Sequence, residues 1–358
     1  MQVARVIGVL EPGGAQLSAL RLTVALREHG MGSALLLAGD ATPEGIALAE
    51  YHGVAVDAFR IADAVTPGAS LQWTPSEPFA RWLTPRLADA DLVHAHMLGA
   101  WWAAARSAPS QVPVVASEHN EVTWPDEDHT GAAASAAPRL DALFVHGPAA
   151  AVFGAAIGLP ARRIHIGRSA VGVLAARPMP GLASPRITFT GRFREDKGPD
   201  VLIEAVAAMA DPLPTYLVGD GPLRGRLLSL ARRCGVADLI HMPGWSFASE
   251  RWIAGSSVHV VPSRQEAWSQ SAVTGLGLGV PVIGTRVDGL QHTLGCERGL
   301  LVQPDDPAAL ARAVEAVLAG NHPDPTPGRR YAAQFSTASV AARYAESYRL
   351  LMREHAPA

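Results

Sequence analysis

VPSRQEAWSQSAVTGLGLGVPVIGT, residues 261–285, contains the end of one strand, a helix and the next strand. The first apolar run ends at Ser263, a carboxylate follows at Glu266, and we expect the helix to begin near Trp268. A second apolar run, PVIGT, closes the stretch. This succession is typical of a βαβ unit, in which the two strands are parallel and the helix covers one face of the sheet.

The same alternation of short apolar runs and helical patterns continues along nearly the whole chain. A proline-rich join at residues 177–185 separates two series of it. Alternating strands and helices imply a parallel, doubly wound sheet, and two series imply two domains with a cleft between them. The expected strands lie at residues 3–10, 33–38, 91–96, 113–117 and 142–146 in the first series, and at 186–191, 215–219, 239–244, 258–263 and 281–285 in the second.

The alternation assigns the chain to the α/β class with three segments. The first domain is expected to cover residues 1–172 and the second residues 173–336. Residues 337–358 follow as a terminal segment, in which 337–354 read as one long helix. Ligands of open α/β sheets bind beyond the carboxyl ends of the strands. The functional residues are therefore expected directly after strands.

Composition narrows the classes of function. Of the 358 residues 48% are hydrophobic, enough for a large core, and a net charge of -3 gives no reason to expect nucleic acid or an anionic membrane as partner. Cys234 and Cys296 are too few for a disulfide framework. The first residues read as a strand rather than a signal peptide, and no apolar stretch approaches the roughly 20 residues that span a bilayer. We expect a soluble, cytoplasmic protein without stable membrane association.

Residues 191–198, GRFREDKG, contain Lys197, the only lysine of the chain. This turn follows the first expected strand of the second domain and precedes a helix that has Pro199 in its first turn. Arg192 and Lys197 beside a helix N-terminus form a good site for a diphosphate. The alternative is a solvated turn in which the acidic residues between them neutralise the two cations.

Two other strand ends carry candidate residues. VGDGP, residues 218–222, is a glycine-rich turn and by itself a weak signal. Glu266 lies at a helix entrance, where its carboxylate can accept hydrogen bonds from the hydroxyls of a ligand, and the amides of residues 267–269 can donate to the same ligand. The alternative is that Glu266 only favours the N-terminus of its own helix.

Together these motifs resemble a known family. GRFREDKG, VGDGP, VPSRQE, the small-residue helix, GVPVIGT and GLLVQPDDPAALARAV occur in the order and spacing of the retaining nucleotide-sugar glycosyltransferases of family 4, which have the GT-B fold. In the first domain the resemblance rests on PGGAQ (12–16), DLVHAH (91–96) and VVASEHN (114–120). It implies two Rossmann-like domains, with the acceptor bound by the first and the donor mainly by the second. It also implies that the last helix crosses back to the first domain.

By position, the resemblance gives catalytic roles to four residues. Arg192 and Lys197 match the pair that holds the donor diphosphate, and Glu266 matches a carboxylate that binds hydroxyls of the donor sugar. His119 resembles the active-site histidine near the transferred sugar, with a buried structural histidine as the alternative. The predicted donor-binding residues are Gly13, Gly14, Gly219, Ala267, Trp268, Ser269, Thr274 and Asp288.

Three positions depart from the family pattern. Thr274 stands where a second glutamate normally binds both ribose hydroxyls, so we expect reduced donor affinity or a ribose that is held differently. The usual Gly-Gly after GVPVIGT reads Val287-Asp288-Gly289, which places an extra carboxylate near the donor. The linker reads Ser169-Ala170-Val171 in place of Asn-Gly-Val. None of these changes removes the sugar-binding carboxylate or the diphosphate pair.

An acidic run, EHNEVTWPDEDHT at residues 118–130, follows an expected strand of the first domain. No lysine or arginine occurs between Arg106 and Arg139, so the run is expected to attract a cationic acceptor and repel lipid phosphates. The alternative is a solvated acidic loop. We expect a soluble, amine-bearing acceptor, such as an aminocyclitol or aminosugar in antibiotic assembly. The predicted acceptor-binding residues are Glu118, Glu121, Asp126, Asp128 and Trp101, the last with core packing as its alternative.

Metal chemistry has little support in the sequence. His94 and His96 alternate on one strand face without an identifiable third ligand, and Asp89-Ala90-Asp91 precedes its strand rather than following it. We expect no cofactor and no metal. The expected reaction is retaining transfer of a hexose or aminohexose from a nucleotide-diphosphate sugar, preferably a UDP-sugar, to an acceptor hydroxyl. The alternatives are a nucleotide-sugar 2-epimerase of the same fold and a non-catalytic GT-B protein that binds a partner enzyme.

Overall fold

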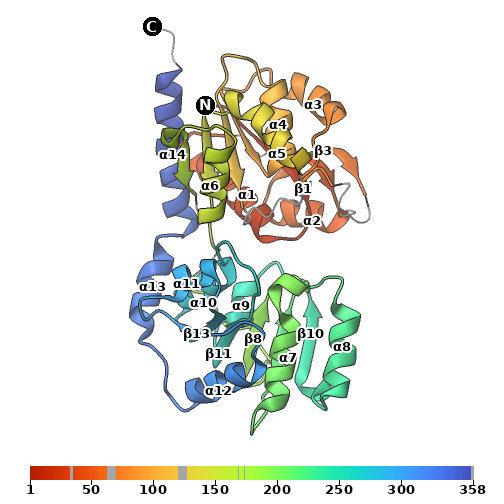
Figure 1. Cartoon of the computed structure of the whole chain (residues 1–358), viewed down its shortest axis with the longest axis vertical. Helices are drawn as coiled ribbons and strands as arrows, with labels where there is room; N and C mark the ends of the chain where they lie inside the picture. The colour runs from red at the N-terminus through yellow and green to blue at the C-terminus, as the bar shows by residue number, and fades with distance from the viewer. Residues whose placement is uncertain (33–34, 63–69, 120–126, 168, 173, 356–358) are drawn as a thin grey trace. The chain divides into compact units, whose positions relative to one another are not determined.

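The computed structural model of the protein describes residues 1–358 except 33–34, 63–69, 120–126, 168, 173 and 356–358. The chain divides into two compact units, Met1–Ala170 with Thr337–Ala358, and Val171–Ser336. Each unit contains one parallel sheet with helices packed on it (Figure 1). The predicted α/β class with two doubly wound sheets is therefore confirmed. The roles predicted for the two domains, acceptor and donor binding, stay predictions.

The sheet of the first unit is wound outward from β1. Its strand order is β3-β2-β1-β4-β5-β6-β7. Five of these strands were predicted, with β2 described only from Leu35 onward, whereas β3 and β7 at the two edges were not. The strands are β1 (Val3–Leu10), β2 (Leu35–Ala41), β3 (Ala55–Ile61), β4 (Leu92–His96), β5 (Val114–Glu118), β6 (Ala142–Val145) and β7 (Ile164–Ile166).

Helices cover both faces of this sheet, because successive residues of a buried strand point to opposite sides. Val6 belongs to a core cluster with Trp101 and Phe79, while the next residue, Ile7, belongs to a second cluster with Leu20 and Leu48. The helices are α1 (Gly14–Ala25), α2 (Pro43–Tyr51), α3 (Glu77–Leu83), α4 (Leu98–Ser107), α5 (Glu127–Ala136), α6 (Pro148–Ala156) and α14 (Thr337–Glu354).

The predicted terminal helix is confirmed as α14, which belongs to the first unit and contacts α1. Tyr344 and Tyr348 lie on its buried face, and Tyr344 packs on Phe144 of β6 at a ring-centroid distance of 4.7 Å. No helix among the described residues is both long enough and apolar enough to cross a membrane.

The second unit repeats the arrangement with six parallel strands in the order β10-β9-β8-β11-β12-β13. The five predicted strands are confirmed, and β13 is an additional edge strand. The strands are β8 (Ile187–Thr190), β9 (Thr215–Val218), β10 (Ile240–Gly244), β11 (Val258–Val261), β12 (Val282–Thr285) and β13 (Leu300–Val302). The helices are α7 (Pro199–Ala208), α8 (Arg224–Arg233), α9 (Ser249–Ile253), α10 (Gln270–Leu278), α11 (Asp288–Leu294), α12 (Pro307–Leu318) and α13 (Pro325–Ala333).

The strand order places the loops after β8 and β11 next to each other. β8 pairs with β9 on one side and with β11 on the other, so the chain reverses its winding direction between β8 and β11. The carboxyl ends of adjacent parallel strands lie at the same edge, and the loops diverge at such a reversal. The GRFREDKG turn and the VPSRQE segment therefore meet at this edge of the second sheet.

Candidate functional site

The GRFREDKG turn folds back against the end of β11. After β8 the chain forms a single 3-10 turn, Glu195–Lys197, and Gly198 then is the N-cap of α7, with φ 61°. A Cβ atom on Gly198 would lie 2.1 Å from the carbonyl oxygen of Pro262, so only glycine allows this close approach. Gly219 of VGDGP likewise allows a close approach between two backbone segments. A Cβ atom on Gly219 would lie 1.9 Å from the Gly191 carbonyl oxygen, at the start of the GRFREDKG turn.

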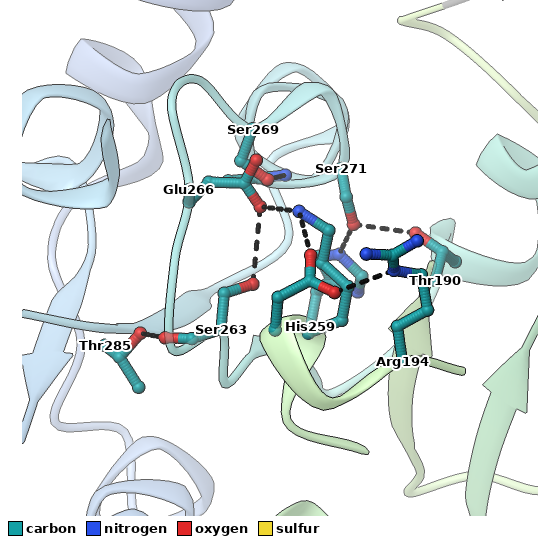
Figure 2. A network of polar contacts seen from close by, with 11 residues as sticks. Thr190, Arg194, His259, Ser263, Glu266, Ser269, Ser271 and Thr285 are labelled. Atoms are coloured by element: carbon teal, nitrogen blue, oxygen red, sulfur yellow. Dashed lines mark hydrogen bonds and ion pairs between the residues drawn. The ribbon is translucent and has the colours of Figure 1, made fainter. Parts of the chain in front are cut away.

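This close approach brings two predicted residues together. Lys197 Nζ lies 3.1 Å from Glu266 Oε2, and the two side chains are 23% and 12% exposed. Ser263 Oγ donates to the same Glu266 oxygen at 3.3 Å (Figure 2). The cation and the carboxylate, 69 residues apart in the sequence, form one partly buried pair. The fold thus brings the GRFREDKG turn and the VPSRQE segment into direct contact.

A second carboxylate lies beside the ammonium group. Asp196 Oδ2 is 3.6 Å from Lys197 Nζ, and Asp196 Oδ1 accepts a hydrogen bond from Arg194 at 2.9 Å. Burial alone raises the pKa of Asp196, but Lys197, Arg194 and Arg192 together lower it below its ordinary value. Asp196 is therefore ionised at neutral pH. Arg192 lies in the same turn and is partly exposed.

Arg264, which the sequence analysis did not select, fixes the two segments to each other. Its guanidinium group donates to both carboxylate oxygens of Asp200 at 3.0 and 2.7 Å, to Asp305 at 2.6 Å and to the Glu195 carbonyl at 2.7 Å. Its backbone N–H donates to the Asp196 carbonyl at 2.8 Å. These hydrogen bonds, above all those to Asp200, raise the pKa of Arg264. Arg264 thereby holds both sides of the Lys197–Glu266 pair.

The helix after Glu266 begins later than predicted. Its first residue is Gln270 rather than one near Trp268, because Ser269 is the N-cap and its side chain accepts from the Ala272 amide at 3.2 Å. Ala267 and Trp268 precede the helix, and Trp268 is only 7% exposed. The ring of Trp268 packs edge-on against Phe335 at 5.1 Å.

Two of the three positions that depart from the family pattern lie in the second unit near Glu266 and have different surroundings. Thr274 is 8% exposed, and its Oγ1 donates to the Gln270 carbonyl one turn earlier in α10 at 2.8 Å. Asp288 is exposed in the first turn of α11. The next residue, Gly289, donates its amide to the Glu266 carbonyl at 2.9 Å. Thus α11 supports the backbone of Glu266.

Gly289→Ala should destabilise the second unit. The new Cβ would lie 2.1 Å from the Glu266 carbonyl oxygen and 2.6 Å from the Ala267 carbonyl carbon, so α11 or the Glu266 segment must move. We expect the free energy of unfolding in urea to fall by about 1–3 kcal/mol, as for other overpacked sites. Gly225→Ala is the matched control, since a Cβ at that helical position meets no atom within 4 Å. It should raise stability by up to about 1 kcal/mol. Equal stability of Gly289→Ala and wild type would contradict the close packing.

The first unit contains a buried polar cluster at the end of β4. Arg5 is 2% exposed, and its Nη1 lies 3.0 Å from His94 Nδ1 and 2.9 Å from His96 Nε2. A guanidinium group has only donors, so both imidazole nitrogens must accept. The two histidine rings stack at 4.3 Å, and Tyr348 of α14 bonds to His94 as well. The buried charge of Arg5 is thus solvated by neutral imidazole groups.

These contacts determine the tautomers of the neutral histidines. Because Arg5 donates to His96 Nε2, the hydrogen of His96 is on Nδ1 and is donated to His119 Nε2 at 2.9 Å. The hydrogen of His119 is then on Nδ1, a buried atom without a hydrogen-bond partner among the described residues. Burial lowers the pKa of His94, His96 and His119 well below 6.5, and the neighbouring imidazoles and Arg5 lower it further. All three are neutral at pH 7.

A metal site is not formed by this cluster. His94 and His96 face Arg5, and within the described ranges no group of three or more His, Cys, Asp or Glu side chains is arranged to hold a metal ion. The sequence analysis placed His119 near a ligand but did not identify Arg5. The signal for Arg5 was its position inside an apolar strand, where an unpaired charge is costly.

The predicted acceptor-side residues have several environments. Trp101 is fully buried in the core cluster of α3 and α4, and Glu118 is 1% exposed, with its Oε1 accepting from the His119 amide at 3.1 Å. Asp128 lies in α5, whose backbone is described there but not its side chain. Glu121 and Asp126 lie outside the described residues. Gly13 is the N-cap of α1, and Gly14 is the first residue of that helix.

Comparison with known proteins places this fold and these motifs in one class. HepE of Anabaena, solved in complex with UDP and glucose, superposes with a TM-score of 0.82 over 98% of this chain and 100% of that chain at 18% identity. That likeness shows the fold, which is the GT-B fold. The "Glycosyltransferase Family 4" model matches residues 12–169, and the "Glycosyl transferases group 1" model matches residues 184–320. The chain therefore belongs to the GT-B glycosyltransferases of family 4.

Curated relatives are similar over part of the chain. The lipopolysaccharide core biosynthesis glycosyltransferase LpsE of Rhizobium meliloti is 34% identical over 38% of this chain and 41% of the relative. The D-inositol 3-phosphate glycosyltransferase of Streptomyces scabiei is 34% identical over 52% of this chain and 47% of the relative. The chain thus spans less than half the length of these two relatives.

Proposed function

We propose that the protein transfers a hexose or aminohexose from a UDP-sugar to a hydroxyl of a small soluble acceptor, with retention of anomeric configuration and without a metal. The contact between Lys197 Nζ and Glu266 Oε2 at 3.1 Å carries this proposal. It joins a cation suited to a diphosphate and a carboxylate suited to sugar hydroxyls at one sheet edge. Both residues occupy the family positions that the sequence motifs indicate.

Each residue has a defined part in the proposed reaction. Lys197 and Arg192 stabilise the charge that develops on the leaving diphosphate, which is the main catalytic contribution. Glu266 accepts hydrogen bonds from sugar hydroxyls and orients the sugar. The leaving oxygen helps to deprotonate the acceptor hydroxyl, which attacks the anomeric carbon from the face that the diphosphate leaves. Because two side-chain cations neutralise the diphosphate, the reaction needs no divalent ion.

Lys197 is suited to bind a diphosphate although it already has acidic neighbours. An ammonium group has three N–H donors. Among the residues that the structure describes, Glu266 and Asp196 are the two carboxylates within 4 Å of Lys197 Nζ. One donor therefore points to neither carboxylate when each accepts one. In the first unit, His119 would present its Nδ1–H to an oxygen of a ligand.

Several similar proteins support the choice of UDP. HepE was solved with UDP and glucose, and a pneumococcal O-GlcNAc transferase with UDP and GlcNAc.

The test of the proposed function is incubation with UDP-, GDP- and dTDP-hexoses in the presence and absence of acceptors, with and without a chelator. We expect nucleotide release that needs an acceptor, prefers the UDP-sugar and survives the chelator, and a product whose anomeric coupling in NMR spectra equals that of the donor. Sugar epimerisation without acceptor would indicate the 2-epimerase. Absence of nucleotide binding in calorimetry would indicate the non-catalytic protein.

For the acceptor we propose an amine-bearing cyclitol or aminosugar, as in antibiotic assembly. The named substrate of the curated D-inositol 3-phosphate glycosyltransferases is a cyclitol, which supports that class of ring. The acidic run 118–130, without lysine or arginine, favours an ammonium group over a phosphate group on it. Glu118 is buried, so the attraction is assigned to Glu121, Asp126 and Asp128.

Neutralising the acidic run should weaken acceptor use. We expect Glu121→Gln and Asp126→Asn each to raise the acceptor KM roughly two- to fivefold, the scale of one exposed charge interaction, while the donor KM is unchanged. Added salt should raise the acceptor KM of wild type in the same direction. Glu28→Gln, at an exposed acidic residue of the first unit, is the control and should have no effect. Equal efficiency with an amine-bearing cyclitol and its phosphate analogue would exclude the proposed acceptor class.

A further inference from the structure

A chain of hydrogen bonds runs from the core of the second unit to its functional edge. At its centre is His259 of β11, which is fully buried. His259 Nδ1 lies 3.2 Å from Thr188 Oγ1 of β8, and His259 Nε2 lies 2.7 Å from Ser271 Oγ of α10. Ser271 Oγ lies 2.7 Å from Thr190 Oγ1, at the end of β8 (Figure 2). The network thus links two strands and a helix.

The inner end of the chain fixes the direction of its hydrogen bonds. Ser256 Oγ lies 3.1 Å from the Trp252 carbonyl oxygen, which can only accept, so Ser256 donates its single hydrogen there. Thr188 Oγ1, at 3.1 Å, must then donate to Ser256. With its hydrogen used, Thr188 accepts from His259 Nδ1–H. The orientation of every inner group follows from one backbone carbonyl.

The same reasoning continues to the outer end. Burial lowers the pKa of His259 to about 4, so the ring is neutral and its Nε2 has no hydrogen. Ser271 therefore donates to His259 Nε2 and accepts from Thr190. Thr190 Oγ1 is left with lone pairs only, and such chains polarise along their length. A neutral threonine hydroxyl is thereby restricted to accepting, as a carboxylate oxygen is.

The exposed surface of its side chains shows at which end this chain of hydrogen bonds is accessible to a ligand. His259 and Thr188 have no exposed surface, whereas Thr190 and Ser271 are partly exposed. Thr190 directly precedes the turn that carries the proposed diphosphate cations. Thr274, one turn beyond Ser271 on α10, has its hydroxyl bonded inside the helix. The chain of hydrogen bonds therefore ends at Thr190, beside the proposed donor site, and not at Thr274.

We propose that Thr190 accepts a hydrogen bond from a hydroxyl of the nucleotide-sugar donor, on either the ribose or the transferred sugar. The inference rests on the proposed function and adds to it a specificity-determining residue. The neutral hydroxyl oxygen of Thr190 accepts a hydrogen bond from a ligand hydroxyl without placing a further negative charge near the diphosphate. Thr190 thus gives the donor site a hydrogen-bond acceptor, although Thr274 stands where the family normally has a second glutamate.

The test measures binding of UDP, 2′-deoxy-UDP, 3′-deoxy-UDP and UDP-glucose by isothermal titration to wild type and Thr190→Val. Loss of one neutral hydrogen bond should weaken binding roughly two- to tenfold. If a ribose hydroxyl is bound, Thr190→Val weakens UDP, and the deoxy analogue that lacks this hydroxyl binds variant and wild type equally. If a sugar hydroxyl is bound, Thr190→Val weakens UDP-glucose but not UDP. Thr190→Ser, which keeps the hydroxyl, should restore affinity in either case.

Two results would overturn the inference alone. One is unchanged binding of UDP and UDP-glucose to Thr190→Val, and the other is equal weakening of UDP and both deoxy analogues, which would indicate general damage. Thr84→Val, whose hydroxyl donates to the Ala80 carbonyl in the first unit, is the control and should bind every ligand as wild type does. If wild type binds neither UDP nor UDP-glucose, the proposed function itself fails and this inference fails with it.

Discussion

Replacing Lys197 by alanine should lower turnover at least about 100-fold, the scale of losing one group that stabilises a developing charge. Lys197 is the only lysine of the sequence, and its Nζ lies 3.1 Å from Glu266 Oε2. Its removal takes a cation from the leaving diphosphate and leaves the Glu266 charge without its partner. Initial rates at saturating UDP-sugar and acceptor measure the effect.

Stability should change much less than turnover in Lys197→Ala. The pair is partly exposed, and Ser263 still donates to Glu266 after the substitution. Arg226→Ala is the matched control, because this exposed cation pairs with Glu195 of the same turn at 2.9 Å. It should keep wild-type turnover. In the double variant with Arg192→Ala, the loss should be less than the product of the single losses, since both cations serve one charge. Wild-type turnover and donor affinity in Lys197→Ala would remove the diphosphate role.

Lowering the pH from 7.5 to 5.5 should destabilise the first unit by about 4 kcal/mol. Burial, together with Arg5 and the neighbouring imidazoles, keeps the pKa of His94, His96 and His119 well below 6.5. Above pH 6.5 neither the folded nor the unfolded chain protonates these groups. Below pH 6.5 the unfolded chain binds protons that the folded chain excludes. The free energy of unfolding therefore falls as the pH is lowered, by about 1.4 kcal/mol per pH unit for each histidine. Urea unfolding at the two pH values measures the difference.

His96→Gln separates this cause from others. The glutamine amide keeps an acceptor for Arg5 and a donor for His119 but does not titrate. The fall in stability between the two pH values should therefore shrink by about one third, even if the variant is less stable at both. His322→Gln, at an exposed histidine, is the control and should leave the fall unchanged. A wild-type protein that is equally stable at pH 7.5 and 5.5 would contradict the neutral cluster.

The central strands could be predicted because both faces of a parallel sheet are buried, so they read as continuous apolar runs. The missed strands are edge strands. β3 contains Asp57 and Arg60 and is mostly half-buried or exposed, while β7 and β13 have three residues each. Edge exposure weakens the apolar signal on which the prediction depends.

The site could be predicted only where its chemistry lies in one motif. Lys197 and Glu266 each follow a strand in a recognisable segment, so their meeting at one sheet edge could be expected. Arg264 acts through Asp200 and Asp305, and Arg5 acts through histidines 89 and 91 residues away. Such roles depend on partners that only the folded chain brings together.

The contribution of α14 to the buried cluster has a consequence for synthesis of the protein on the ribosome. Tyr348 bonds to His94, and Tyr344 stacks on the same ring at 5.6 Å. The nascent first unit therefore lacks the last side chains of its polar core until α14 has been translated, after the whole of the second unit. The second unit, Val171–Ser336, is a continuous segment and can complete its own sheet before that moment. The unit that is translated first is thus the one that matures last.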